Sequence, residues 1–177
     1  MSSKIYCNTQ NILDIPLKAG DAILLSGTVY TARDAVHKRL CAMIKEGAPL
    51  PFPLDGSIIY YAGPTPAQKG FAVGACGPTT SSRMDPYIPL LYENGLRVTI
   101  GKGDRAPAVY ESIRKHRGLY LCAVGGAGAL AGRSIRTSEV IAFPELGCES
   151  VKRMEIEDFP LFVGIDAEGN SIFGGKQ

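Results

Sequence analysis

The sequence predicts an α/β protein built on a mixed β-sheet, forming a single domain over residues 1–177. Short strand-like runs recur along the whole chain, and segments with helical periodicity lie between several of them. The long early strands are not all followed by helices, which favours a mixed sheet over a purely parallel, doubly wound one. The chain has 177 residues, 45% hydrophobic and 20% charged, which is enough to bury a substantial core.

The strand predictions come from apolar and β-branched runs bounded by turn residues. These runs are residues 5–7, 22–30, 57–62, 71–75, 97–100, 119–124, 140–143 and 162–165. After the last run, Glu168-Gly169-Asn170 predicts a hairpin turn.

Helical periodicity predicts three helices. The first follows a Thr31 and Asp34 pair that resembles a capping box, and its apolar stripe runs through Gly47. The second covers residues 83–93 and contains two prolines, which must lie in its first turns or kink it. The third covers residues 107–117.

Composition excludes several classes of protein. The net charge of +2 is too small to indicate a nucleic-acid surface, and the short basic run 114–117 fits a solvated helix C-terminus. The N-terminus lacks the apolar stretch of a secretory signal. The apolar stretch 119–131 is too short to span a bilayer and is broken by glycines. We therefore expect a cytoplasmic protein with no nucleic-acid or membrane partner.

The cysteines do not predict a metal site or a disulfide framework. They are odd in number, widely separated and without a Cys-x-x-Cys pair, and the chain has only two histidines. We interpret most thiols as small core residues in a reducing compartment, with Cys76 distinguished only by its place beside a Gly-Pro corner. The cysteines are Cys7, Cys41, Cys76, Cys122 and Cys148.

Residues 76–85, Cys-Gly-Pro-Thr-Thr-Ser-Ser-Arg-Met-Asp, predict an anion-binding corner. Gly77 and Pro78 end an apolar run, and four hydroxyl side chains and then Arg83 follow. Backbone N–H groups at a helix start, hydroxyl donors and a guanidinium all suit a carboxylate or a phosphate. The alternative is that Thr79 to Ser82 only cap a helix, but four hydroxyls exceed what one cap uses.

Two further cations follow strands. Lys102 lies between Gly101 and Gly103, after the run 97–100, and Arg33 lies after the run 22–30 in the first helical turn. An arginine there is unfavourable for the helix dipole, which suggests another partner. The carboxyl ends of strands are where α/β sheets place ligands. Arg33, Arg83 and Lys102 together would supply the charge that a small dicarboxylate needs.

The glycine-rich segment 124–132 nearly matches a dinucleotide-binding fingerprint. Its last glycine falls one position late, and the acidic residue expected about twenty residues on, at the end of a second strand, is missing. Close packing of a helix against a strand explains these glycines more simply.

Five motifs, in order along nearly the whole chain, carry a resemblance to a known family. They are Gly27-Thr28 with Thr31-Ala32-Arg33-Asp34, the segment 77–85, Gly101-Lys102-Gly103, Gly125-Gly126-Ala127-Gly128-Ala129 and Phe143-Pro144-Glu145-Leu146-Gly147. On these motifs the chain resembles the beta subunit of iron-sulfur, class I type fumarate hydratases and L(+)-tartrate dehydratases, equivalent to the C-terminal domain of the single-chain enzymes. One departure is Ser82, where a smaller residue is expected.

The resemblance implies a swivelling β/β/α domain and a hydro-lyase active only with an alpha subunit. It implies that Arg33, Arg83 and Lys102 bind substrate and that Thr79 and Lys102 are catalytic, with Thr79 as the candidate base. A 4Fe-4S cluster would be held by three cysteines of the alpha subunit and no metal by this chain, in a hetero-oligomer of the alpha2beta2 kind. The implied reaction is reversible dehydration of (S)-malate to fumarate, or of tartrate to oxaloacetate.

Two other interpretations of the function remain open at this point. A stand-alone dicarboxylate-binding module could use the same residues without iron. A self-sufficient hydrolase with Thr79 or Ser81 as nucleophile is disfavoured, because neither histidine lies in a recognisable elbow motif. The sequence does not distinguish malate from tartrate or a methylated analogue, because one substituent changes pocket contacts by only a few kcal/mol.

Overall fold

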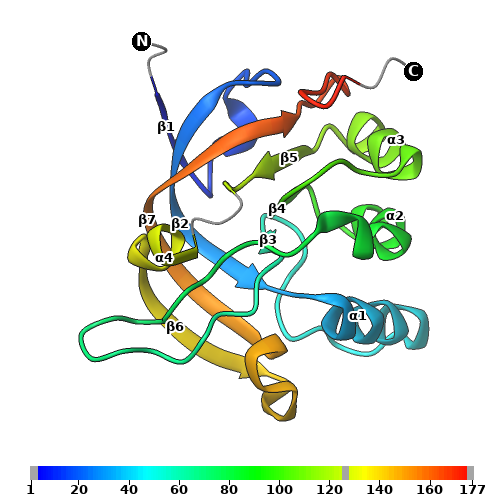
Figure 1. Cartoon of the computed structure of the whole chain (residues 1–177). Coiled ribbons are helices and arrows are strands. Elements are labelled where there is room, and N and C mark those ends of the chain that lie inside the picture. Colours follow the sequence, from blue (N-terminus) through cyan, green and yellow to red (C-terminus); the bar gives the residue numbers. More distant parts are fainter. Residues whose placement is uncertain (1–3, 125–127, 175–177) are drawn as a thin grey trace.

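A computed structural model describes residues 4–124 and 128–174, and it confirms a mixed α/β fold (Figure 1). The strands are β1 (Ile5–Asn8), β2 (Ala22–Thr31), β3 (Ile58–Tyr60), β4 (Val98–Gly101), β5 (Leu119–Cys122), β6 (Ile135–Ala142) and β7 (Val151–Ile165). The helices are α1 (Asp34–Glu46), α2 (Ile88–Glu93), α3 (Pro107–His116) and α4 (Gly128–Arg133). Short 3-10 turns are η1 (Ile12–Asp14), η2 (Ser81–Arg83), η3 (Asp85–Tyr87) and η4 (Pro144–Glu149).

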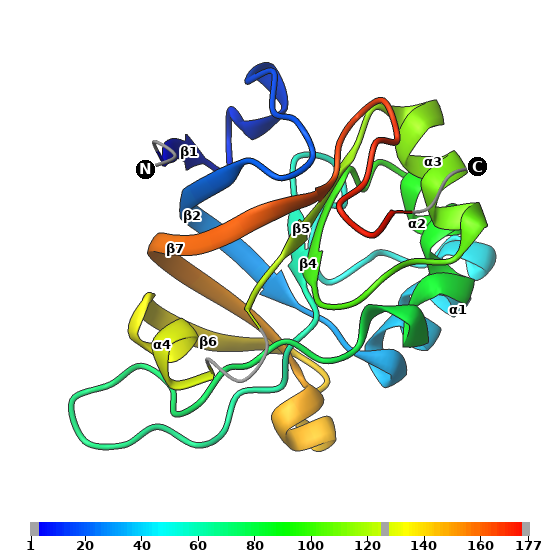
Figure 2. The ribbon, with the colours of Figure 1, turned by 45° about the horizontal axis from the view of Figure 1, so that its top comes forward.

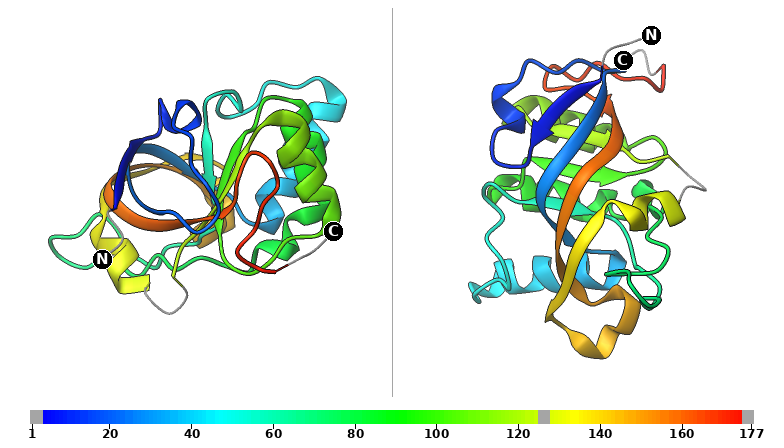
Figure 3. Two further views of the ribbon diagram at one scale, coloured as in Figure 1. Left: turned by 90° about the horizontal axis from the view of Figure 1, so that it is seen from above. Right: turned by 90° about the vertical axis from the view of Figure 1, so that its left-hand side faces the viewer.

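The sheet closes on itself. Strands β2, β3, β4 and β5 are parallel neighbours, and the long β7 pairs antiparallel with both β5 and β2. These pairings form a closed circuit, and β2 and β7 curve around it when the molecule is seen from above (Figure 3). Strand β1 extends β2, and β6 extends β7. Because the parallel strands are neighbours, their carboxyl ends lie at one end of the sheet.

Alternate residues of the central strands face two separate cores. Ile58 and Tyr60 of β3 pack inside the closed sheet, whereas Ile59 packs with residues of α1, α2 and α3 on the outer face. The same alternation holds in β5, where Leu119 and Leu121 point inward and Tyr120 points to the helices. Figure 2 shows the three helices together on that one side of the sheet.

The first helix is confirmed through Gly47, which takes a left-handed conformation at φ 67°. The predicted capping box is wrong. Thr31 is the last residue of β2, and the N-cap is Arg33, with no side-chain cap bond. The Thr31 hydroxyl is used elsewhere, because it donates to the Ser150 carbonyl and accepts the N–H of Lys152.

The second predicted helix, residues 83–93, is α-helical only over α2. The chain before α2 forms the 3-10 turns η2 and η3 instead, with Pro86 in η3. Pro89 lies in the first turn of α2, as predicted, where its missing N–H breaks no helical hydrogen bond. The third helix is confirmed as α3, although Arg117, at φ 52°, takes the left-handed position. Gly118 is needed for space, because a Cβ there would lie 2.4 Å from the Arg97 carbonyl oxygen.

The strand predicted over residues 71–75 is wrong. This segment is the returning half of a projecting loop, residues 63–77, which we call the arm (Figures 1 and 3). Its backbone groups bond to Thr65 on the outgoing half and not to a neighbouring strand of the sheet. Apolar Val73 is buried, which is why the segment has the composition of a strand.

The run predicted at 162–165 is only the end of β7, and the run predicted at 140–143 covers the end of β6 and one residue beyond it, Phe143. The remaining residues of these strands were not predicted because the charged side chains of the exposed face interrupt the apolar pattern. Buried residues such as Met154 and Ile156 alternate with those charged residues. The turn predicted after β7 is confirmed by an Asp166 N–H bond to the Asn170 carbonyl, 3.0 Å, around Gly169 at φ 84°. Among the helices of residues 4–124 and 128–174, none combines the length and apolar character required to cross a bilayer.

Candidate active site

The predicted site residues lie at the carboxyl end of the parallel strands. Arg33 follows β2, and Lys102 follows β4 directly. Thr79 lies beside the residue after β3, because its N–H donates to the Tyr61 carbonyl at 2.8 Å. Arg83 ends η2, the turn that continues from Thr79. This is the end of the sheet at which open α/β folds place ligands.

Backbone bonds hold the hydroxyl-rich loop beside the lysine loop. Thr80 and Lys102 form an isolated parallel bridge. The Ser81 N–H donates to the Lys102 carbonyl, and the Lys102 N–H donates to Ser81 Oγ, each at 3.0 Å. Within the described residues, no side-chain cap bond is made at Thr80, the N-cap of η2, so simple capping does not account for these hydroxyls.

Ser81 belongs to a buried group that we call the hydroxyl clamp: Ser81, Tyr120 and the backbone of Gly101 to Gly103. Ser81 Oγ lies 2.8 Å from the Tyr120 hydroxyl, which donates to the Gly103 carbonyl at 2.9 Å. A Cβ at Gly101 would lie 1.9 Å from Ser81 Oγ, so only glycine allows this approach. Burial raises the pKa of Tyr120, which keeps its hydroxyl protonated as a donor.

A buried ion pair between Asp85 and Arg105 holds the hydroxyl-rich loop and the lysine loop together. Arg105 Nε donates to Asp85 Oδ1 at 2.7 Å, and the second oxygen of Asp85 accepts the Ala106 N–H at 2.6 Å. The guanidinium is fully buried and lies 4.7 Å from the centre of the Tyr120 ring. Burial by itself lowers the pKa of Arg105, but Tyr61 and Asp85 outweigh it and the net pKa is raised, so the charge persists.

Sequence reasoning missed Arg105 and gave Asp85 no role of its own. The available signal was weak: an arginine three residues after Lys102, in the same loop, is usually taken as solvated. Its burial depends on Tyr61, the residue after β3, and on Tyr120 of β5, which could not be placed beside it from the sequence.

Both predicted substrate-binding arginines pair with carboxylates of the chain itself. Arg33 Nη2 lies 3.0 Å from Glu149 Oε1, and Arg83 pairs with Asp34. Because Asp34 follows Arg33 directly, the two pairs lie at the start of α1. Within the described part of the chain, Arg33 Nε is buried without a hydrogen-bond partner, and Lys102 makes no ion pair.

His37 supports the backbone of Arg33 from one helical turn away. Its Nδ1–H donates to the Arg33 carbonyl at 2.9 Å, and its ring is buried against Tyr61 and Tyr87. Burial lowers the pKa of His37 to about 4, partly offset by this hydrogen bond. The ring is therefore neutral at physiological pH. The sequence gave no signal for this role.

The turn η4 brings Glu149 to Arg33. Lys152 holds this turn, because its Nζ donates to the carbonyls of Gly147 and Cys148, at 3.2 and 3.1 Å, and to Ser150 Oγ at 2.7 Å. Burial lowers the pKa of Lys152. The motif Phe143 to Gly147 therefore belongs to the site through the position of Glu149.

The cysteines do not fit a role as cluster ligands. Cys7, Cys41 and Cys76 are buried, Cys122 is half-buried and Cys148 is exposed. Among the described residues, no three His, Cys, Asp or Glu side chains gather as metal ligands. Burial raises the pKa of Cys76 to about 12, as expected for a packed thiol. Gly125 to Ala127 of the glycine-rich motif lie outside the described residues.

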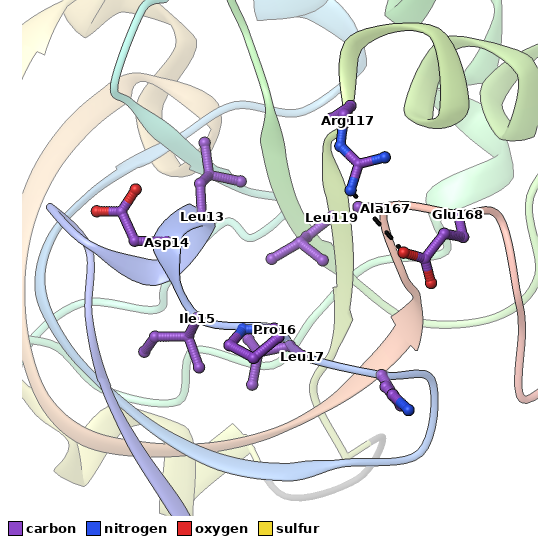
Figure 4. Close-up of a pocket in the computed structure, with 10 residues that line it drawn as sticks. Leu13, Asp14, Ile15, Pro16, Leu17, Arg117, Leu119, Ala167 and Glu168 are labelled. Carbon is purple, nitrogen blue, oxygen red and sulfur yellow. Dashed lines mark ion pairs between the residues drawn. The ribbon is translucent and has the colours of Figure 1, made fainter.

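A cavity of about 310 Å³ lies away from this site (Figure 4). Leu119, the first residue of β5, lines it, so it is at the amino end of the parallel strands. Its charged groups are exposed, and the Arg117 to Glu168 pair across it is 3.8 Å long. None of the predicted site residues lines this cavity.

The fold and the site define a mixed α/β domain that presents cations and hydroxyl groups at the carboxyl end of its parallel strands, which suits a small anion. The motif resemblance is confirmed by comparison with known proteins. The chain belongs to the fumarase C-terminus family, whose family model matches residues 6–175.

Relatives in this family fall into two length classes. Fumarate hydratase 2 of Leishmania major is 43% identical over 156 residues, which cover 87% of this chain and 28% of that protein. The anaerobic class I fumarate hydratase of Escherichia coli strain K12 is 42% identical over 151 residues, 84% of this chain and 28% of that protein. A putative L(+)-tartrate dehydratase subunit beta of Methanocaldococcus jannaschii is 37% identical over 163 residues, 89% of this chain and 84% of that protein. The chain thus spans about 28% of the length of these fumarate hydratases.

The buried ion pair predicts a large stability effect. Asp85→Asn leaves the Arg105 charge buried without its counter-ion, which should lower the free energy of unfolding by about 3–5 kcal/mol in urea titrations. The control Glu93→Gln breaks the exposed pair with Lys115 and should cost less than about 1 kcal/mol. Equal losses in both variants would show that the buried pair has no special role.

The hydroxyl clamp predicts a local change in backbone protection. Tyr120→Phe removes the partner of Ser81 Oγ, so the Lys102 amide should exchange hydrogen about tenfold faster relative to the Leu121 amide. Tyr110→Phe is the control, since its hydroxyl bonds to Asp104 and Ser171 outside the clamp. If both variants change the ratio of Lys102 to Leu121 exchange equally, the clamp does not position Lys102.

His37 predicts a pH dependence. Its folded pKa of about 4 lies below the ordinary value of about 6.5. The unfolded chain therefore binds more protons between these values, and about 3 kcal/mol of stability is lost as pH falls from about 6.5 to 4. In NMR titrations, with His116→Gln used for assignment, the His37 ring should not titrate above about pH 5. A midpoint near 6.5 would contradict a buried neutral ring.

Proposed function

We propose that this domain binds the substrate carboxylates in an iron-sulfur-dependent hydro-lyase that interconverts a 2-hydroxydicarboxylate and its dehydration product, (S)-malate and fumarate. This proposal rests on one observation. Backbone bonds hold the segment from Thr79 to Ser81 beside Lys102, at the same end of the sheet as Arg33 and Arg83. The fumarate hydratases among the relatives support it.

The reaction explains why cations gather here. Dehydration removes a proton from the carbon next to one carboxylate, which then bears additional negative charge, and hydroxide leaves the neighbouring carbon. The cluster of the partner subunit would supply a Lewis acid for that hydroxide. Arg33, Arg83 and Lys102 bind the two carboxylates and stabilise this charge. Guanidinium groups suit the task because they bind carboxylates with two parallel hydrogen bonds.

Substrate binding requires the internal ion pairs to open. Glu149 leaves Arg33, Asp34 leaves Arg83, and a substrate carboxylate takes each place. Exchange of one carboxylate for another keeps each arginine neutralised. Lys102, which makes no ion pair among the described residues, adds the charge that the free domain leaves uncompensated.

Thr79 is the proposed base that accepts the proton from carbon. An alcohol is a weak base, and it needs nearby cations that favour its alkoxide. Lys102 is the cation proposed for this task, since the Thr80 bridge holds its loop beside the loop of Thr79. Thr79 is half-buried, so part of its surface remains open to a substrate.

The partner in this proposal is an alpha subunit that holds the 4Fe-4S cluster, because the described cysteines of this chain do not fit as its ligands. The subunit beta relative, matched over 84% of its length, supports a separate partner. We further propose a cytoplasmic alpha2beta2 assembly in which this domain is the swivelling β/β/α unit.

A second candidate is L(+)-tartrate dehydration. It is favoured by the relative that this chain matches over 84% of that protein's length, at 37% identity. Tartrate differs from malate by one hydroxyl, and contacts to that group can come from either subunit. A stand-alone dicarboxylate-binding module is the third reading, and it requires tight binding by the isolated chain.

The test is anaerobic co-expression with an alpha subunit, followed by assays of fumarate hydration and tartrate dehydration. Thr79→Ala should lower kcat by about 10²–10⁴-fold with KM largely kept, because the base acts in the chemical step. Thr80→Ala, an exposed neighbour, is the matched control and should keep near-normal kcat. Normal turnover by Thr79→Ala would remove Thr79 from the chemistry, and absence of both activities in the wild-type complex would refute the proposed function.

A further inference from the structure

Three exposed apolar side chains lie on neighbouring segments beside the proposed site. Phe71, on the arm, is 52% exposed, Leu130, on α4, is 52% exposed, and Val124, just after β5, is 53% exposed. The arm projects from the body of the domain next to α4 and β6 (Figures 1 and 3). Apolar side chains that gather into a contiguous exposed patch mark an interaction surface, and the packing of these segments on one another is therefore decisive.

Hydrogen bonds and close packing hold the two halves of the arm together. The Thr65 N–H donates to the Ala75 carbonyl at 2.9 Å, and the Ala75 N–H returns a bond to Thr65 Oγ1 at 2.8 Å. The Gly74 N–H donates to the Thr65 carbonyl at 3.0 Å. A Cβ at Gly74 would lie 2.3 Å from Thr65 Oγ1, so the two halves of the arm pack too closely for any other residue.

Helix α4 is joined to the arm through glycines one turn apart. A Cβ at Gly132 would lie 2.3 Å from the Gly74 carbonyl oxygen, and a Cβ at Gly128 would lie 3.2 Å from the Gly77 nitrogen. The Cys76 N–H donates to the Gly128 carbonyl at 2.9 Å. These glycines therefore serve close packing, but against the arm and not against a strand as the sequence predicted, and they join the arm and α4 closely.

A cavity of about 290 Å³ lies between the arm and α4. Phe71, Val73 and Ala129 form apolar walls, and Arg133 stands at the rim. Arg133 is exposed and makes no ion pair among the described residues. The cavity fits an apolar side chain of another protein segment with an acidic residue next to it.

We propose that the arm, α4 and Val124 form the docking surface for the cluster-bearing alpha subunit, which inserts an apolar side chain flanked by an acidic residue between Phe71 and Arg133. This inference rests on the proposed function. The arm runs directly into Pro78 and Thr79, and β5 ends beside β4, where the Ala123 N–H donates to the Gly101 carbonyl at 2.9 Å. A partner that completes a site at Thr79 must approach this face.

The relatives supply the second argument for this occupant. Fumarate hydratases that this chain matches contain a further 72% of sequence outside the match, given the 28% that is covered. Packing of that sequence on a face beside the predicted substrate residues would bring the two parts of a site together. Docking there also excludes water from the space around Thr79.

The test measures assembly and turnover separately. The alpha subunit is one that gives turnover with the wild-type chain. Phe71→Ser and Leu130→Ser should each weaken the complex at least about tenfold in anaerobic sedimentation or interferometry, since each removes an exposed apolar contact. Arg133→Glu should weaken it comparably through charge reversal. Ile172→Ser is the matched control, 47% exposed on the tail after β7, and should leave Kd unchanged.

The outcomes separate the two proposals. Far-ultraviolet circular dichroism and thermal unfolding of the isolated variants should match wild type, because both apolar side chains are exposed. Wild-type turnover with unchanged Kd for Phe71→Ser and Leu130→Ser would overturn the docking surface and leave the proposed function intact. If the wild-type chain forms a homodimer and the Phe71→Ser variant is a monomer, this surface is an interface between two copies of the chain. That result would also overturn the docking proposal. No turnover with any alpha subunit would instead refute the proposed function.

Discussion

The buried ion pair of Asp85 and Arg105 joins the two loops on which the proposed site depends. An apolar pair of the same volume could stabilise the fold as well, because desolvation consumes much of the Coulomb energy of buried charges. It could not set the same geometry. Asp85 accepts Arg105 Nε with one oxygen and the Ala106 N–H with the other, so the turn after Ser81 and the loop after Lys102 have one fixed register. The main role of this ion pair is therefore to fix the relative position of the two loops, more than to stabilise the fold.

The closed sheet determines which residues can meet above that pair. Because β7 pairs with both β2 and β5, the parallel strands are held in a ring, and the segments after β2, β3 and β4 emerge together. Residues far apart in sequence, such as Arg33 and Lys102, then share one end of the domain. The ring also leaves its outer face to α1, α2 and α3, whose packing needs Tyr61 and Tyr120 on that side. Those tyrosines bind Arg105 and complete the link between core and site.

The sequence indicated the residues of the candidate site more clearly than the residues that support them. Lys102 between glycines after a strand, and Thr79 after a Gly-Pro corner, are local patterns with a local physical meaning. The function of Arg105 depends on burial between two layers, which no short window encodes. The length of β7 was missed for a related reason, since its exposed charges disguise an alternation that becomes clear only when its partner strands are known. The arm was misread because a buried Val73 gives a loop the composition of a strand.

The internal ion pairs limit how strongly this domain alone can bind another carboxylate. A carboxylate that replaces Glu149 on Arg33 gains little net Coulomb energy, because one ion pair is exchanged for another. The pair of Arg83 and Asp34 is more exposed, with Arg83 at 50%, so it opens at lower cost but also contributes less when remade with substrate. In the free domain both arginines are therefore paired with carboxylates of the chain itself. Exclusion of water by a docked partner would strengthen each substrate contact, because charges interact more strongly at lower dielectric. The same docking would make Lys102 the unneutralised charge that draws the substrate into place.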